Sequence, residues 1–121
     1  MLSLAQQQII DRYQNPLFRG DVSNATHTSS GENLSCGDEV TWQARVVDGV
    51  IEELKHQCTA CAVCSASADI LAGTFSGKPL SIIQNHTNDE VVEALGVPLS
   101  PIRRKCAILP LEALKKLSPN L

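Results

Sequence analysis

An alternation of apolar and polar residues in the first half of the chain gives the clearest indication of structure. Residues 40–46 alternate at every position, which is typical of a strand with one buried face, and Trp42 is expected to lie in the core. Asp48 and Gly49 then provide a two-residue turn signal, so residues 50–56 should return antiparallel to the first strand. The pattern predicts a β-hairpin.

Helix signals surround this hairpin. Ser3 and Thr87 each stand three residues before a Gln or a Glu, which is the capping-box arrangement that opens a helix. Small residues after the hairpin favour another helix, and Pro79 suits the first turn of a short one. The predicted helices cover residues 4–13, 62–74, 80–84 and 88–95, and a last helix begins near Cys106.

Pro110 determines where that last helix is expected to begin. A proline is tolerated in the first turn of a helix but costs about 3 kcal/mol or more in the interior, where its missing N–H breaks the hydrogen-bond ladder. A start near Cys106 satisfies this requirement. The helix dipole and the basic residues at 103–105 would then favour the thiolate form of Cys106.

Residues 21–35 differ from the rest because they are rich in Ser, Thr, Asn and Gly and show no sustained period. We expect a mobile loop with room for one short edge strand. The whole pattern predicts an α+β fold, in which a small antiparallel β-sheet packs against helices on one face. A length of 121 residues is that of one domain, so residues 1–121 are interpreted as a single unit.

Charge and hydropathy restrict the classes of partner. The 10 basic and 13 acidic side chains are nearly balanced, so no electrostatic footprint for nucleic acid is present. No apolar stretch approaches the roughly 20 residues that span a bilayer. The N-terminal segment resembles neither a signal peptide nor a transit peptide, and we therefore expect a reducing cytoplasmic location without membrane partners.

Five cysteines, an odd number, favour metal or sulfur chemistry over a disulfide framework in such a compartment. Cys58, Cys61 and Cys64 lie at three-residue steps, without the further cysteine of a ferredoxin loop or the second pair of a zinc knuckle. Cys36 and Cys106 must therefore complete any closed site. The hairpin places Cys36 before its first strand and the triplet after its second, so the two groups can converge.

Several of these residues also have a purely structural interpretation. Free cysteines often behave as small buried hydrophobic residues, which is favoured for Cys64 and left open for Cys58. Asp38 is either an Asx-turn residue or a fourth, more exchangeable ligand beside three thiolates. The three histidines are isolated in the sequence, and we expect surface or turn positions for them: His27, His56 and His86.

Several motifs together resemble the U-type iron-sulfur cluster assembly scaffolds, the IscU/SufU/NifU N-terminal family, over essentially the whole chain. The resemblance places the ligand of the triplet at Cys61, because only this register matches both the following helix and the Gly-Lys pair. Cys58 and Cys64 then stand where the family commonly has other small residues. The matching segments are Tyr13-x-Asn15-Pro16-x-x-x-Gly20, Cys36-Gly37-Asp38, residues 61–68, Gly77-Lys78 and Lys105-Cys106-Ala107-x-Leu109.

The resemblance implies the SufE/IscU-like fold and a scaffold that holds a nascent, transferable [2Fe-2S] cluster or iron. It implies ligation by Cys36, Asp38, Cys61 and Cys106, and sulfur received from a cysteine desulfurase, with Cys106 and Cys36 as candidate persulfide acceptors. Asp38 is expected to help the cluster leave. Recipient apo-proteins and a chaperone are the further partners that the resemblance implies.

Two alternatives use the same residues. A zinc-dependent sulfurtransferase of the SufU branch would relay persulfide sulfur, and Lys105 before Cys106 agrees with that branch. The 45 residues from Cys61 to Cys106, however, leave no room for the insertion that the branch carries. The other alternative is a structural zinc-binding domain. We favour a carrier over an enzyme, and Cys58 and Cys64 are hypothesised to add sulfur capacity or redox protection.

Overall fold

The predicted hairpin is the centre of the sheet in the computed structural model, which describes residues 2–34 and 37–119. Strand β2 (Asp38–Val47) pairs antiparallel with β3 (Val50–Thr59) through the two-residue turn. Asp48 and Gly49 have φ angles of 52° and 77°. Both lie in the left-handed region, as a type I′ turn requires. The hairpin and its turn are confirmed.

The strand for which residues 21–35 left room is present as β1 (His27–Asn33), so the prediction of a loop is wrong for this part of the segment. It pairs with β2 from His27 opposite Ala44 to Asn33 opposite Asp38, and the two-residue strand β4 (Ser118–Pro119) pairs with its other edge. The sheet order is β3-β2-β1-β4. β1 shows no apolar alternation in its sequence, and it pairs with β2 along its whole length.

The first helices follow the predicted boundaries closely. They are α1 (Leu4–Gln14), α2 (Ala62–Phe75), the short 3₁₀ helix η1 (Leu80–Asn85) and α3 (Asn88–Leu95). Ser3 and Thr87 both form the predicted capping boxes, with Gln6 and Glu90 respectively. Gly96 ends α3 in the left-handed conformation. Local sequence signals are sufficient at these helix ends.

Helix α4 (Pro101–Leu114) begins five residues before the predicted start at Cys106. Ser100 caps it and Pro101 occupies its first turn, so Pro110 lies in the interior. Burial of a leucine contributes about 1.5–3 kcal/mol, and this helix buries Leu109, Leu111 and Leu114. Packing therefore offsets the cost of about 3 kcal/mol for one interior proline. The carbonyl of Pro110 also accepts a buried hydrogen bond from Trp42 Nε1, 2.9 Å away.

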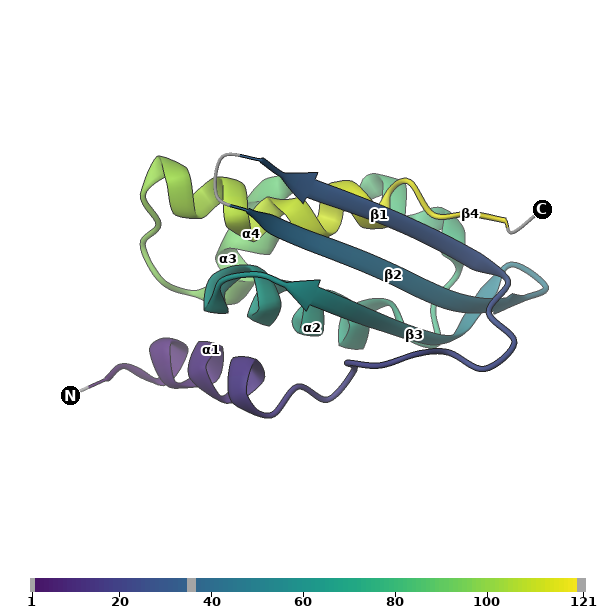
Figure 1. Ribbon diagram of the computed structural model, residues 1–121, viewed down its shortest axis with the longest axis horizontal. Helices are drawn as coiled ribbons and strands as arrows, with labels where there is room; N and C mark the ends of the chain where they lie inside the picture. The colour runs from purple at the N-terminus through teal and green to yellow at the C-terminus, as the bar shows by residue number, and fades with distance from the viewer. Residues whose placement is uncertain (1, 35–36, 120–121) are drawn as a thin grey trace.

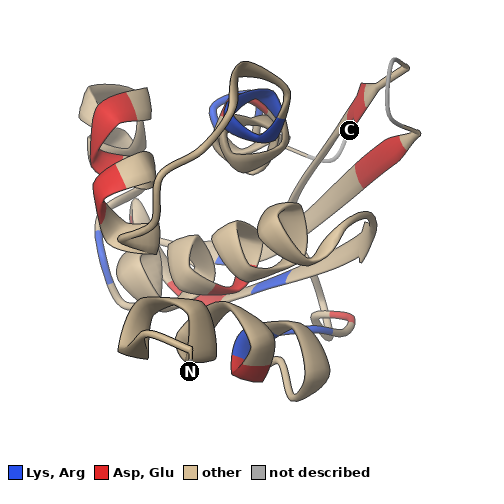
Figure 2. Ribbon diagram, turned by 90° about the vertical axis from the view of Figure 1, so that its left-hand side faces the viewer, with Lys and Arg blue, Asp and Glu red and all other residues tan. Residues whose placement is uncertain are grey.

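The helices lie on one face of the sheet, as predicted for this α+β fold (Figure 1). Helices α2 and α4 pack directly on the strands, and α1 and α3 pack on α2. Trp42 is fully buried between the layers, as expected. Figure 2 shows acidic residues grouped on one helix at this end of the molecule and basic residues grouped on another. Among residues 2–34 and 37–119, no helix is long and apolar enough to cross a membrane.

Candidate metal site

Asp38 lies at one end of the sheet because it is the first residue of β2. It stands opposite Asn33, the last residue of β1, and the neighbouring strand β3 ends close by, where Glu39 pairs with Thr59. Its side chain is almost completely buried, with 3% exposure. A buried carboxylate requires hydrogen-bond donors or a cation, so its surroundings indicate its role.

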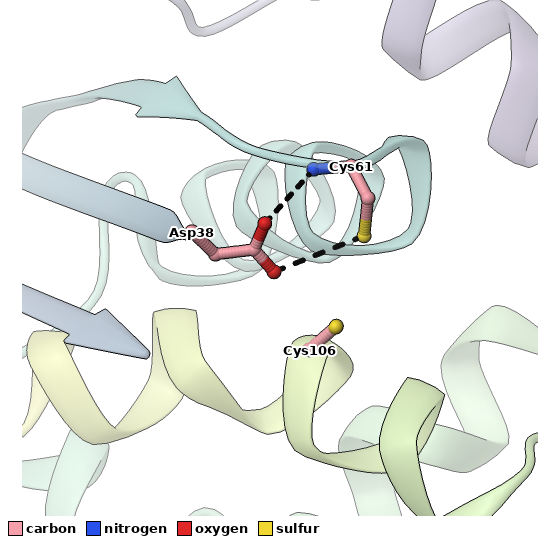
Figure 3. A group of neighbouring side chains, drawn as sticks. All are labelled: Asp38, Cys61 and Cys106. Atoms are coloured by element: carbon pink, nitrogen blue, oxygen red, sulfur yellow. Dashed lines mark hydrogen bonds between the residues drawn. The ribbon is translucent and has the colours of Figure 1, made fainter. Parts of the chain in front are cut away.

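Cys61 provides two of the groups around this carboxylate. It is the N-cap residue of α2, in extended conformation, and its backbone N–H lies 3.2 Å from Asp38 Oδ1. Its thiol lies 3.9 Å from Asp38 Oδ2 (Figure 3). The carboxylate therefore accepts a hydrogen bond from the backbone of the residue that precedes the helix, and Cys61 itself remains partly exposed. The predicted start of this helix at residue 62 is confirmed.

Cys106 completes a group of three candidate ligands from the helix layer. Its sulfur points from α4 toward the other two side chains, and one ligand atom of each of Asp38, Cys61 and Cys106 lies within 4.8 Å of the others (Figure 3). Cys106 is the sixth residue of α4 and only 1% exposed. The sequence analysis expected the helix dipole to favour a thiolate at Cys106 because the helix would begin there. That expectation is wrong, since Cys106 lies inside α4, although its side chain does reach the candidate site.

Two thiols and a carboxylate form a mixed donor set that suits zinc or iron. Ligand atoms on one tetrahedral ion with bonds of about 2.3 Å stand roughly 3.8 Å apart. The three groups could therefore reach one ion after movements of about an ångström. The carboxylate is the hardest and most exchangeable of these donors. An arrangement of this kind can hold a metal without enclosing it permanently.

The remaining predicted ligand, Cys36, lies outside the residues that the structure describes. Cys58 and Cys64 are described, but they lie in the core rather than among the three grouped ligands. Cys64 is fully buried within α2, as expected for a small core residue. Cys58 belongs to strand β3 and is 8% exposed, so it also lies in the core.

A second polar group, which the sequence did not reveal, is centred on Asp69. This fully buried residue is the only charged one in α2. Its carboxylate accepts hydrogen bonds from Arg12 Nη1 at 2.9 Å and from the backbone N–H groups of Leu17 and Phe18 at 3.1 and 2.8 Å. A lone acidic residue in an otherwise apolar helix was the available signal, because a buried carboxylate must find partners.

His56 is the fourth partner of Asp69, which makes the predicted surface or turn position of this histidine wrong. Its Nε2 lies 3.0 Å from Asp69 Oδ1, and its side chain is 2% exposed. On the other side of the ring, Nδ1 lies 3.5 Å from the sulfur of Cys58. Trp42 packs edge-on against the imidazole, with ring centroids 5.8 Å apart. The histidine thus links Asp69 to Cys58.

These contacts alter the acidity of the groups involved. Burial by itself raises the pKa of Asp69, but the hydrogen bonds that it accepts outweigh burial and lower the pKa to about 2. Burial likewise lowers the pKa of His56, yet hydrogen bonds with Asp69 and Cys58 leave that pKa above its ordinary value. The pair is therefore stabilised as carboxylate and imidazolium.

Comparisons with known proteins show which family the chain resembles. Residues 4–117 match the model of the NifU-like N terminal domain. Iron-sulfur cluster assembly scaffold protein IscU 1 of Archaeoglobus fulgidus is 31% identical over 109 residues, which cover 90% of this chain and 71% of that protein. The bifunctional protein NifU/MnmA of Rubrobacter xylanophilus is 29% identical over 110 residues, and the chain spans only 22% of its length.

A solved structure supports the same relationship. A protein from Fervidobacterium islandicum, proposed to be an iron-sulfur cluster assembly scaffold for the SUF system, superposes with a TM-score of 0.77. The two sequences are 26% identical, and the match covers 90% of this chain and 92% of the other. The family match extends over nearly the whole chain and includes every element that builds the site. The chain therefore belongs to the family of NifU-like N-terminal domains.

Proposed function

We propose that this protein is a scaffold for iron-sulfur cluster assembly. The observation that carries the proposal is the convergence of Asp38, Cys61 and Cys106 from three separate elements onto one end of the sheet. Relatives named as cluster assembly scaffolds support it. Cys36, two residues before Asp38 in the sequence, is proposed as the fourth ligand on the basis of the family resemblance.

Sulfur would arrive as a persulfide on a cysteine desulfurase. A thiolate of this protein attacks the outer sulfur atom, forms a new S–S bond and releases the desulfurase cysteine as a thiolate. Cys106 and Cys36 are the acceptors proposed from the sequence. Because Cys61 is partly exposed whereas Cys106 is 1% exposed, the structure adds Cys61 as a third candidate.

The cargo proposed for this site is a [2Fe-2S] cluster that passes to recipient apo-proteins, with a chaperone as a further candidate partner. The mixed donor set fits this role because a carboxylate exchanges more readily than a thiolate. Such transfer belongs in a reducing compartment such as the cytoplasm, where the thiols stay reduced. Zinc in the isolated protein would occupy the same ligands.

Anaerobic reconstitution tests the proposal. The protein is incubated with ferrous iron, cysteine, a cysteine desulfurase and dithiothreitol, and it is followed by visible absorption and Mössbauer spectroscopy. We expect a [2Fe-2S] spectrum that is lost in Cys61→Ala and Cys106→Ala. Cys64→Ala, which removes a buried thiol outside the ligand group, is the matched control and should retain the spectrum.

Two other outcomes would replace the proposal. Tightly held zinc, no cluster and faster turnover of the desulfurase would identify a zinc-dependent sulfurtransferase. A structural zinc domain would be identified by bound zinc whose cysteine ligands resist alkylation and persulfidation, in a protein that does not change the turnover of the desulfurase.

A further inference from the structure

A groove of about 370 Å³ lies between helices α2 and α3. The side chains of Leu71, Val91 and Leu95 reach its base from the core, where each is almost completely buried. Ile70 and Ala94, which are partly and largely exposed, also line it. The groove therefore offers apolar contacts at a surface that solvent can reach.

Helix α2 separates this groove from the candidate metal site. Cys61 precedes the first turn of α2, whereas Ile70 and Thr74, which line the groove, lie in its last two turns. A helix rises about 1.5 Å per residue, so Ile70 lies roughly 14 Å along the axis from Cys61. A molecule that binds beside Ile70 and Thr74 therefore leaves the metal ligands uncovered.

The rim of the groove is acidic. Glu90 and Glu93 line it from α3, and none of the described residues that line it is Lys or Arg. Helix α3 also carries Asp89 and has no basic residue, so its carboxylates form a group on this helix (Figure 2). Glu93 is exposed and makes no ion pair or side-chain hydrogen bond within residues 2–34 and 37–119. Its charge is available to a partner.

Contacts at the start of α3 hold the groove in shape. The side chains of Thr87 and Glu90 each accept a hydrogen bond from the backbone N–H of the other, at 3.1 and 3.2 Å. Glu90 Oε2 also lies 3.5 Å from His86 Nδ1, and the ring of His86 packs edge-on against Phe75 at the end of α2, with centroids 5.2 Å apart. A surface prepared in this way loses little conformational freedom on binding.

We propose that this acidic groove binds a basic amphipathic helix of a partner protein. Such a helix directs apolar side chains at i, i+3, i+4 and i+7 into a groove, and Lys or Arg beside them would face Glu90 and Glu93. The same carboxylates repel nucleic acid and anionic membrane surfaces. Sites for small ligands enclose most of the ligand, whereas this groove is only half enclosed. The proposal goes beyond the scaffold function and does not depend on it.

The test uses the full chain, free of metal and labelled with nitrogen-15 for NMR spectroscopy. It is titrated with a synthetic helical peptide of leucine and lysine whose leucines form one face. We expect saturable amide shifts confined to the groove, at residues 70–74 of α2 and 90–95 of α3. Added salt should weaken the binding, because exposed charges are screened.

Two variants separate the charge of the groove from its shape. Glu93→Lys should weaken binding at least about fivefold, because like charges then meet across the interface. Ala94→Trp should weaken it to a similar extent, because the indole fills the groove from an exposed position of α3. Glu112→Lys is the matched control for the change of charge and should bind as the wild type does, since Glu112 is an exposed residue of α4 outside the groove.

The proposal is overturned if the shifts lie outside the groove, or if Glu93→Lys binds as tightly as Glu112→Lys. It is also overturned if a peptide with glutamate in place of lysine binds equally well, or if the free chain dimerises through α3, which would assign the groove to a second copy. The wild-type shift map requires no substitution, so it decides even where a variant folds poorly. Because no iron is present, failure here leaves the scaffold proposal to the reconstitution experiment.

Discussion

Asp69 shows how much a single buried side chain can organise in this protein. Its two carboxylate oxygens accept hydrogen bonds from Arg12 in α1, from backbone N–H groups in the segment after α1, and from His56 in β3. Three parts of the chain are thus attached to α2 through one carboxylate. The attachment depends on the negative charge, because each partner donates to it.

Replacing Asp69 with Asn should destabilise the fold by about 3 kcal/mol at pH 7, since a buried charge pair loses one member. The deficit should shrink in acid. The pKa of Asp69 is about 2 when folded and lies near its ordinary value of 3.8 when unfolded. Its ionisation therefore stabilises the fold above about pH 4, and this stabilisation is lost as the pH falls toward 2. Urea denaturation of both proteins from pH 7 to pH 2.5 measures the difference.

Asp11→Asn is the matched control, because Asp11 is an exposed carboxylate in α1 beside Arg12. It should change the free energy of unfolding by no more than about 0.5 kcal/mol. A deficit for Asp69→Asn that stays constant from pH 7 to pH 2.5 would contradict the assigned pKa.

Asp38→Ala should give a cluster that survives several-fold longer, because the most exchangeable proposed ligand is removed and the thiolates remain. The measurement is the rate at which the visible spectrum decays when an apo-ferredoxin is added to reconstituted protein. Glu39→Ala removes the exposed carboxylate of the next residue and should leave the rate unchanged. Transfer from Asp38→Ala at the wild-type rate would show that the carboxylate does not assist release.

The hairpin and most helix ends could be predicted because local patterns determine them. Period-two alternation, a two-residue turn and capping boxes each act within a few residues, and all of them are present in the structure. β1 and the start of α4 could not be predicted in this way. The first is a polar segment held by its neighbouring strand, and the second depends on the burial of leucines far from its first turn.

The contact between β1 and α4 gives a prediction at the scale of these elements. A Cβ at Gly31 would stand 3.0 Å from the Cβ of Ala113, which is closer than side chains normally pack. Gly31→Val should therefore force α4 away from the sheet and destabilise the fold by about 1–3 kcal/mol. Ser30→Val, on the exposed side of the same strand, is the control for strand propensity. Equal denaturation midpoints for the two variants would show that α4 adapts without cost.

The candidate site belongs to the molecule as a whole, because its three described members are distant in sequence. Strand topology alone predicted that the start of the hairpin lies close to Cys61. The structure agrees, because Asp38 at the start of β2 accepts a hydrogen bond from Cys61. Cys106 reaches the same place from the interior of α4, where tertiary packing rather than a local signal positions it. The His56 and Asp69 pair could not be found from spacing, since strand and helix must first pack together.

A ligand that connects three elements should stabilise the folded molecule. Zinc that binds only the folded state raises the free energy of unfolding by about 2.7 kcal/mol at one hundred times its dissociation constant. We therefore expect the melting temperature of chelator-treated protein to rise by several degrees on addition of zinc. The gain should be lost in Cys61→Ala and Cys106→Ala, and it should remain in Cys64→Ala, whose thiol lies outside the ligand group. An undiminished gain in the Cys106 variant would place the zinc elsewhere, because α4 would then have no part in holding it.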